Sequence, residues 1–201
     1  MTNPYLTKIP YALLYSRLVV AVLIIVFSFV QTPPSLIVAL VVYAIISDIF
    51  DGIIARALHV SSPEMRREDT KIDTVFWFSC LFFICMKHSG FLKTQVLQVG
   101  ILVFTEFFII AIGYIKFHER ISYHTFLSKL WALILLWFFI EMTLNGISTY
   151  GFNITFWYGL VVQTEIVIIA FILKTTHTDV PGLAHAFKLR KGKEIRKKCL
   201  F

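Results

Sequence analysis

The sequence contains few charged residues for its length. Charged residues make up 15% of its 201 residues, and only 12 residues are acidic, whereas a soluble domain carries about 25% charged residues. Hydrophobic residues make up 58% of the chain, and its mean hydropathy is +0.78. These values exclude a water-soluble globular domain and an intrinsically disordered chain.

Cysteine and glycine are also scarce. Three cysteines and nine glycines exclude a disulfide framework and a collagen-like repeat. Cys80 and Cys85 lie in an apolar run and are interpreted as small core residues. The cysteines have no metal-ligand spacing, and no internal repeat is evident.

Long apolar runs dominate the chain. A helix needs about 20 apolar residues to cross a hydrocarbon layer that is about 30 Å thick. Six runs qualify or nearly qualify, at about residues 11–30, 35–58, 66–86, 94–117, 126–144 and 154–173. The sequence therefore predicts an all-α membrane protein with six transmembrane helices. We expect these helices to form one transmembrane domain over residues 1–174, with a basic cytoplasmic tail over residues 175–201.

Basic residues are unevenly distributed among the connections. The first connection (residues 31–34) and the fifth (145–153) contain no lysine or arginine, and the third contains Lys87 and Lys93. The other basic residues lie at the two ends of the chain and around the second and fourth connections. By the positive-inside rule, this pattern predicts that both termini are cytoplasmic, as six spans require. We expect a bacterial inner membrane or an equivalent membrane.

The basic run at residues 188–198 has two interpretations, which are a nucleic-acid contact and a membrane-surface contact. No aromatic residues are interleaved with its basic residues. A basic segment next to a membrane gains about 1 kcal/mol per basic residue near anionic lipid. We therefore expect a lipid partner and no nucleic acid.

Two pairs of aspartates stand near one connection between predicted helices. Asp48 and Asp51 are three residues apart near the end of the second helix, and Asp69 and Asp73 are four apart near the start of the third. These spacings place each pair on one helix face. Because the connection is short, we expect the two helices to be antiparallel neighbours whose aspartates converge at the cytoplasmic side.

Such a convergence needs positive charge. A carboxylate at the centre of a membrane costs about 2.5–3.5 kcal/mol, and four carboxylates repel one another. A divalent cation removes both problems, and ligands that are all oxygens suit Mg²⁺, Mn²⁺ or Ca²⁺. The alternative is that the aspartates pair with basic side chains, for which the candidates are Arg17, Arg56, Arg66 and Lys71.

The residues after Asp51 suggest a ligand contact. Gly52 follows directly, and Ala55 and Arg56 come about one helical turn later. Glycine inside a helix costs about 1 kcal/mol relative to alanine, but small residues let a ligand or a second helix approach the backbone. The planar guanidinium of Arg56 suits phosphate. Helix packing at Gly52 is the alternative.

Together these residues resemble the signature of the CDP-alcohol phosphatidyltransferase family, D-x-x-D-G-x-x-A-R, eight or nine residues, then G-x-x-x-D-x-x-x-D. Every fixed position matches in register except one, because Met65 stands where the family has its second glycine. The chain is therefore identified as a divergent member of the family. Ile9, Pro10 and Arg17 also resemble part of the family's first-helix opening.

The resemblance implies a function and a set of roles. The function is metal-dependent transfer of a phosphatidyl group from CDP-diacylglycerol, or a similar CDP-alcohol, to an alcohol acceptor, with release of CMP, in phospholipid biosynthesis. The implied cofactors are Mg²⁺ or Mn²⁺, as two ions, and the implied assembly is a homodimer. The implied roles are metal ligation by Asp48, Asp51, Asp69 and Asp73, general-base catalysis by Asp73, and nucleotide or pyrophosphate binding by Gly52, Ala55 and Arg56.

The acceptor is less clearly indicated. Lys116, Arg120 and Lys129 lie around the connection between the fourth and fifth predicted helices. They are candidates for binding a phosphorylated acceptor such as a polyol phosphate. The alternative is that they are only the basic residues expected of a cytoplasmic connection.

A second function class is a membrane divalent-cation transporter or channel that uses the four aspartates as its ion site. A transporter is expected to place its site near the middle of the membrane and to contain repeats. The aspartates instead lie toward one membrane face, and this favours the enzyme.

Overall fold

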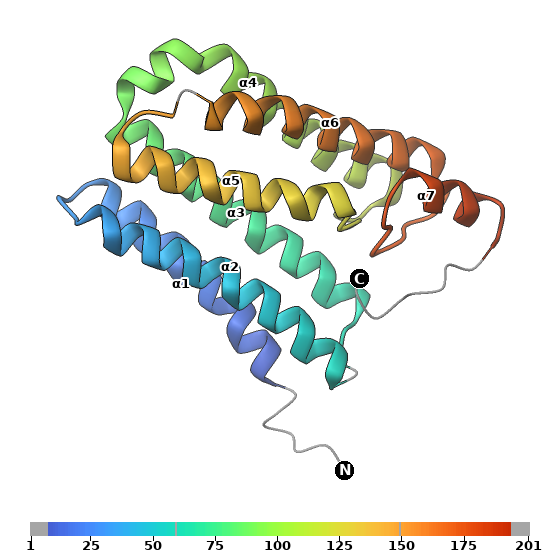
Figure 1. Cartoon of the computed structure of the whole chain (residues 1–201). Helices are drawn as coiled ribbons and strands as arrows, with labels where there is room; N and C mark the ends of the chain where they lie inside the picture. The colour runs from blue at the N-terminus through green and yellow to red at the C-terminus, as the bar shows by residue number, and fades with distance from the viewer. Residues whose placement is uncertain (1–7, 59, 149, 194–201) are drawn as a thin grey trace. The chain divides into compact units, whose positions relative to one another are not determined.

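The computed structural model describes residues 8–58, 60–148 and 150–193, which form helices joined by short connections (Figure 1). These residues contain no β-strand beyond an isolated parallel bridge between Ser122 and Thr178. The predicted all-α class is therefore confirmed. The elements are α1 (Ile9–Ser28), α2 (Pro34–Ala57), α3 (Pro63–Lys87), α4 (Ser89–Ile112), the π-helix η2 (Gly113–Phe117), α5 (Phe126–Asn145), α6 (Gly151–Ile172) and α7 (Leu183–Arg190).

Five helical segments among the described residues are long and apolar enough to cross a membrane, namely α1, α2, α4 continued by η2, α5 and α6. Their number and composition are those of a multi-pass integral membrane protein. The predicted third span corresponds to α3, which is not among the five. Its first half carries a run of charged residues between Glu64 and Asp73. A sixth span along α3 and the cytoplasmic location of both termini stay predictions.

Proline marks the start of the first three helices. Pro10, Pro34 and Pro63 lie in the first turns of α1, α2 and α3, where a missing N–H costs nothing and the fixed φ suits the helix. Ser62 adds a cap to α3, because its hydroxyl accepts a hydrogen bond from the Met65 N–H at 3.2 Å. The start of α3 determines where Asp69 and Asp73 stand along it.

The N-terminal turn of α3 also carries an acidic side chain. Hydrogen bonds from its own backbone N–H and from the Ser62 hydroxyl lower the pKa of Glu64. A negative charge at this end of a helix is favourable because the first N–H groups lack helical partners. The charge of Glu64 therefore supports the start of α3.

Contacts divide the chain into two compact units, Met1–Thr94 with Phe139–Ser148, and Gln95–Phe138 with Thr149–Phe201. In the first unit, α1 packs along both α2 and α3. Leu14, Ile24, Ile37 and Val41 are fully buried there. Lys87, the last residue of α3, donates a hydrogen bond from Nζ to the Val30 carbonyl at 2.8 Å. This bond ties the end of α3 to the chain just beyond α1.

The second unit contains most of α4, η2, the first part of α5, α6 and α7. Its core includes Ile109, Ile121, Ile169 and Val180. The connection before α5 pairs with the segment after α6, since the Phe126 N–H donates to the Pro181 carbonyl at 3.2 Å. Part of the predicted tail is therefore packed in this unit, where α7 contacts α6. Residues 194–201 of that tail lie outside the described residues.

Gly159 makes possible the close contact of α6 with Trp131 of α5. A Cβ atom at position 159 would lie 2.7–2.9 Å from atoms of the Trp131 ring. The ring cannot move freely, because its Nε1 donates a hydrogen bond to the Thr155 carbonyl at 3.1 Å. We predict that Gly159→Ala lowers the free energy of unfolding by about 1–3 kcal/mol, as overpacking does. Thermal unfolding in detergent measures this change.

The matched control is Gly100→Ala in α4. Gly100 is exposed, and a Cβ atom there would meet nothing within 4 Å. Alanine has the higher helix propensity by about 1 kcal/mol, so this variant should be as stable as the wild type or more stable. Equal midpoints for the two variants would contradict the packing argument.

Candidate functional site

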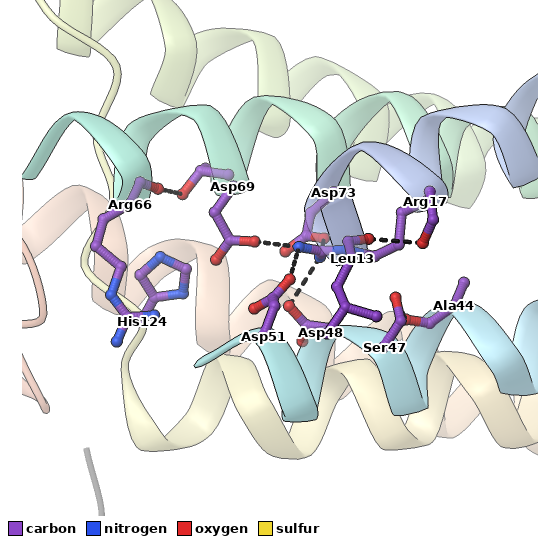
Figure 2. A network of polar contacts seen from close by, with 12 residues as sticks. Leu13, Arg17, Ala44, Ser47, Asp48, Asp51, Arg66, Asp69, Asp73 and His124 are labelled. Atoms are coloured by element: carbon purple, nitrogen blue, oxygen red, sulfur yellow. Dashed lines mark hydrogen bonds and ion pairs between the residues drawn. The ribbon is translucent and has the colours of Figure 1, made fainter. Parts of the chain in front are cut away.

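The first unit brings the four predicted aspartates together. Asp48 and Asp51 come from α2, Asp69 and Asp73 come from α3, and all four side chains face Arg17 of α1 (Figure 2). The four acids are called the aspartate cluster below. The convergence that their helical spacing predicted is therefore observed, with an arginine at its centre.

Arg17 joins α2 to α3 through both of its terminal nitrogens. Its Nη1 donates to Asp48 Oδ1 at 2.7 Å and also to Asp73. Its Nη2 donates to Asp51 Oδ2 at 2.7 Å and also to Asp69. Each nitrogen thus contacts one acid from each helix. Because α1 packs against both helices, the site is built from three helices, whereas the sequence indicated two.

From the sequence, Arg17 was one of several possible partners of the aspartates and part of a resemblance to the family's first-helix opening. The available signal was an arginine inside the first apolar run, because a buried charge in such a helix needs an opposite charge. The alternative of pairing with a basic side chain is therefore realised through Arg17. In these contacts, four carboxylates share one guanidinium. The formal charge of these five side chains is about −3 when all are ionised.

The aspartate cluster is buried on one side and accessible on the other. The side chains of Asp51 and Asp69 are 3% and 5% exposed, whereas those of Asp48 and Asp73 are 40% and 32% exposed. Burial strengthens the repulsion between carboxylates by lowering the local dielectric constant. The exposed rim is the side from which a cation or ligand would reach the acids.

The donor set fits a divalent metal ion. Asp48, Asp51 and Asp69 each offer a carboxylate oxygen, and these oxygens all lie within 4.8 Å of one another. Ligands that bind Mg²⁺ at about 2.0–2.1 Å in an octahedron are roughly 3–4 Å apart. The three oxygens therefore lie close to the spacing that one ion requires. Hard cations prefer such an all-oxygen set.

Gly52 and Ala55 are buried in α2, next to the aspartate cluster in the sequence. A Cβ atom on Gly52 would lie 3.4 Å from the nearer terminal nitrogen of Arg56, and the three nearest atoms all belong to Arg56. The nearest neighbour of this position is therefore the side chain of Arg56 in the same helix. The role of Gly52, Ala55 and Arg56 as nucleotide or pyrophosphate contacts stays a prediction.

Met65, which stands at the position of the family's second glycine, lies in the first turn of α3. Its side chain is almost fully buried. Its backbone N–H is used by the Ser62 cap. Met65 therefore packs inside the first unit as part of the start of α3.

The three predicted acceptor-binding residues, Lys116, Arg120 and Lys129, all lie in the second unit. Lys116 Nζ donates to the Ala170 carbonyl at 2.7 Å, so it satisfies the C-terminal end of α6. Lys129 stands in the first turn of α5. Their acceptor-binding role stays a prediction.

Arg120 forms a partly buried ion pair in the second unit. Its Nη2 lies 2.6 Å from Glu106 Oε1 of α4, and its side chain is 5% exposed. A lone glutamate inside an apolar run was the sequence signal for this pair. Arg120 therefore has a structural role in joining α4 to the connection before α5.

A family model described as CDP-alcohol phosphatidyltransferase matches residues 7–180. The match covers most of the chain and contains the whole aspartate cluster. No curated protein and no solved structure matches the chain.

The ion pair between Glu106 and Arg120 yields a stability prediction. Removing one partner of a buried pair leaves the other charge uncompensated, at a cost of about 3–5 kcal/mol. Because Glu106 is partly exposed, we expect Glu106→Gln to lower the free energy of unfolding by about 2–3 kcal/mol. Chemical or thermal unfolding in detergent measures the loss.

Glu68→Gln is the matched control, because Glu68 pairs with Lys71 at 2.7 Å on an exposed surface of α3. Exposed pairs contribute about 0–1 kcal/mol, so this variant should be close to the wild type. If Glu106→Gln lowers the free energy of unfolding no more than Glu68→Gln does, the ion pair does not stabilise the second unit as we expect.

Proposed function

Because the chain belongs to the CDP-alcohol phosphatidyltransferase family, we propose that it transfers a phosphatidyl group from CDP-diacylglycerol, or a similar CDP-alcohol, to an alcohol acceptor and releases CMP. Family membership makes the chain a transferase that uses a CDP-alcohol donor and an alcohol acceptor. The observation that carries the proposal is the aspartate cluster, in which three carboxylate oxygens lie within 4.8 Å of one another. A polyol or a polyol phosphate is the acceptor we propose.

The cluster would hold the divalent ions of the reaction. Asp48, Asp51 and Asp69 are the proposed ligands, with Asp73 as a further acid of the site. Two Mg²⁺ or Mn²⁺ ions, when bound, would neutralise a pyrophosphate and the charge that develops on the leaving group. The surplus negative charge of the cluster and its all-oxygen donor set support this assignment.

Arg56 and Asp73 have separate roles in the proposed reaction. Arg56, beside Gly52, would hold the pyrophosphate through its planar set of donors. Asp73, whose side chain is 32% exposed, would accept the proton of the acceptor hydroxyl. The acceptor oxygen then bonds to the phosphorus that carries the lipid. The bond between that phosphorus and the bridging oxygen breaks, and CMP leaves with the electron pair. Phosphoryl transfer of this kind depends mainly on positioning and charge.

The membrane setting suits such a reaction. We propose that residues 1–174 carry the site at the cytoplasmic face of a bacterial inner membrane or an equivalent membrane. The nucleotide would then stay in water while the acyl chains stay in lipid. Residues 175–201 would contact anionic lipid through their basic side chains. A homodimer is part of the same proposal.

The acceptor would be recognised by basic side chains. Lys116, Arg120 and Lys129 are the proposed contacts for a phosphorylated acceptor. Lys116 and Arg120 would bind it while they keep their contacts with the Ala170 carbonyl and with Glu106. The family match favours the transferase over the cation transporter or channel.

Asp51→Asn and Asp73→Asn test the reaction. We predict that each lowers the rate of CMP release by about 100-fold or more, because the first removes a metal ligand and the second a general base. The measurement is CMP release by purified protein with CDP-diacylglycerol, Mg²⁺ or Mn²⁺, and a panel of alcohols.

The control for these two variants is Asp179→Asn. Asp179 lies outside the cluster at φ 56°, a backbone conformation that asparagine tolerates well, so this variant should release CMP at the wild-type rate. Wild-type rates in the two cluster variants would refute the proposed roles. Divalent-cation flux into liposomes without any CMP release would establish the transporter instead.

Met65→Gly tests the departure from the family signature. We predict that the variant keeps or improves its affinity for CMP, because the glycine restores room beside the nucleotide. The loss of a buried side chain should lower the free energy of unfolding by about 2–5 kcal/mol. Calorimetric titration of the folded variant with CMP measures the affinity. A large loss of affinity would show that Met65 forms part of the pocket.

A further inference from the structure

Arg17 holds a position that a cofactor cation would also need. Its side chain is 1% exposed, and its two terminal nitrogens contact all four acids of the aspartate cluster. Three of these acids are also the ones whose oxygens lie close enough to share a metal ion. The guanidinium and an ion bound to those acids would therefore compete for the same carboxylates.

The hydrogen-bonding capacity of arginine matches the cluster closely. The two terminal nitrogens of a guanidinium carry four N–H donors, and Arg17 uses these nitrogens for one contact with each of the four acids. A lysine would offer three donors from a single nitrogen. Arginine is thus the side chain that can contact every acid while it holds α2 and α3 in register.

The hydrogen bonding of the Arg17 side chain is nevertheless incomplete. Its Nε is buried and has no hydrogen-bond partner among the residues that the structure describes. A buried donor without a partner carries the full cost of leaving water. Among the described contacts of Arg17, one guanidinium also faces four carboxylates. The unpartnered Nε lowers the cost of moving the guanidinium, whereas the excess of carboxylates favours a cation of higher charge in its place.

We propose that Arg17 is the resident counter-ion of the aspartate cluster in the absence of metal and that divalent ions bind by displacing its guanidinium. Arg17 then has two effects that oppose each other. It stabilises the metal-free protein, and it weakens the affinity for metal. This inference rests on the metal site of the proposed function, and it concerns the metal-free state that the proposed function leaves undescribed.

The test compares Mn²⁺ binding and thermal stability in the wild type, Arg17→Met, Arg17→Lys and Arg67→Met. Methionine keeps much of the side-chain length without the charge. Arg67 is the matched control, because it lies in α3 and pairs with Glu64 at 3.4 Å, outside the cluster. Mn²⁺ binding is followed by the loss of its free-ion electron paramagnetic resonance signal in detergent, at one fixed pH and without substrate. Unfolding midpoints are measured with a chelator and with excess Mn²⁺.

Arg17→Met should bind Mn²⁺ with a dissociation constant about tenfold or more below that of the wild type, because no internal cation has to be displaced. Its midpoint in chelator should fall by about 10 °C, since the buried acids lose their counter-ion. Excess Mn²⁺ should restore the midpoint to near that of the metal-loaded wild type. Arg17→Lys should fall between the two in Mn²⁺ affinity, and Arg67→Met should behave as the wild type.

Other results would overturn the inference. If Arg17 only positions the helices, both Arg17 variants should bind Mn²⁺ more weakly than the wild type, or equally. If Arg17→Met does not fold even with Mn²⁺, Arg17→Lys decides, and a dissociation constant no lower than that of the wild type refutes displacement. Absence of Mn²⁺ binding in every variant also refutes it.

The outcome is separable from that of the proposed function. A chain that binds Mn²⁺ as expected but releases no CMP would overturn the reaction and leave the role of Arg17 standing. If the protein releases CMP but neither Arg17 variant gains Mn²⁺ affinity, the proposed reaction stands and the proposed role of Arg17 is refuted.

Discussion

Carboxylates placed among apolar helices must find positive charge, and this constraint shapes the first unit of the protein. The aspartate cluster meets it through Arg17, which is almost completely buried. The contact needs α1 against both α2 and α3, and it needs α3 to begin where Pro63 and the Ser62 cap place it. Helix starts, helix packing and the position of the acids are therefore parts of one arrangement.

Polar and charged groups among the apolar helices of the second unit also have partners. Glu106 pairs with Arg120, and Gln163 bonds to Thr105 and to the Leu102 carbonyl. These contacts tie the helices of that unit together. The cluster instead sets four acids against one base. An excess of acids over bases is more typical of a functional site than of a structural pair.

The distribution of exposure fits chemistry at a membrane surface. Asp51 and Asp69 are held in the interior by α2 and α3, whereas Asp48 and Asp73 are accessible. A buried floor fixes the geometry of ligands, because packed side chains cannot move far. In the proposed reaction, the nucleotide and the acceptor would reach the acids from the accessible rim. Reactions at phosphorus depend mainly on positioning and charge, and both are properties of this arrangement.

The sequence by itself determined the features that depend on local composition and helical spacing. Long apolar runs predicted the helices, because burial in lipid depends on the residues of each segment. Spacings of three and four placed each pair of aspartates on one helix face. The family signature adds an order of functional residues along α2 and α3.

Only the tertiary structure decided how separate segments meet. Arg17, Arg56, Arg66 and Lys71 were equally available as partners in the sequence, and the packing of α1 against two helices selected Arg17. Likewise, packing gave Arg120 its partner Glu106 and buried part of the predicted tail. Such pairings join residues that are far apart in the chain. The spacing of residues within one helix does not predict which other helix packs against it.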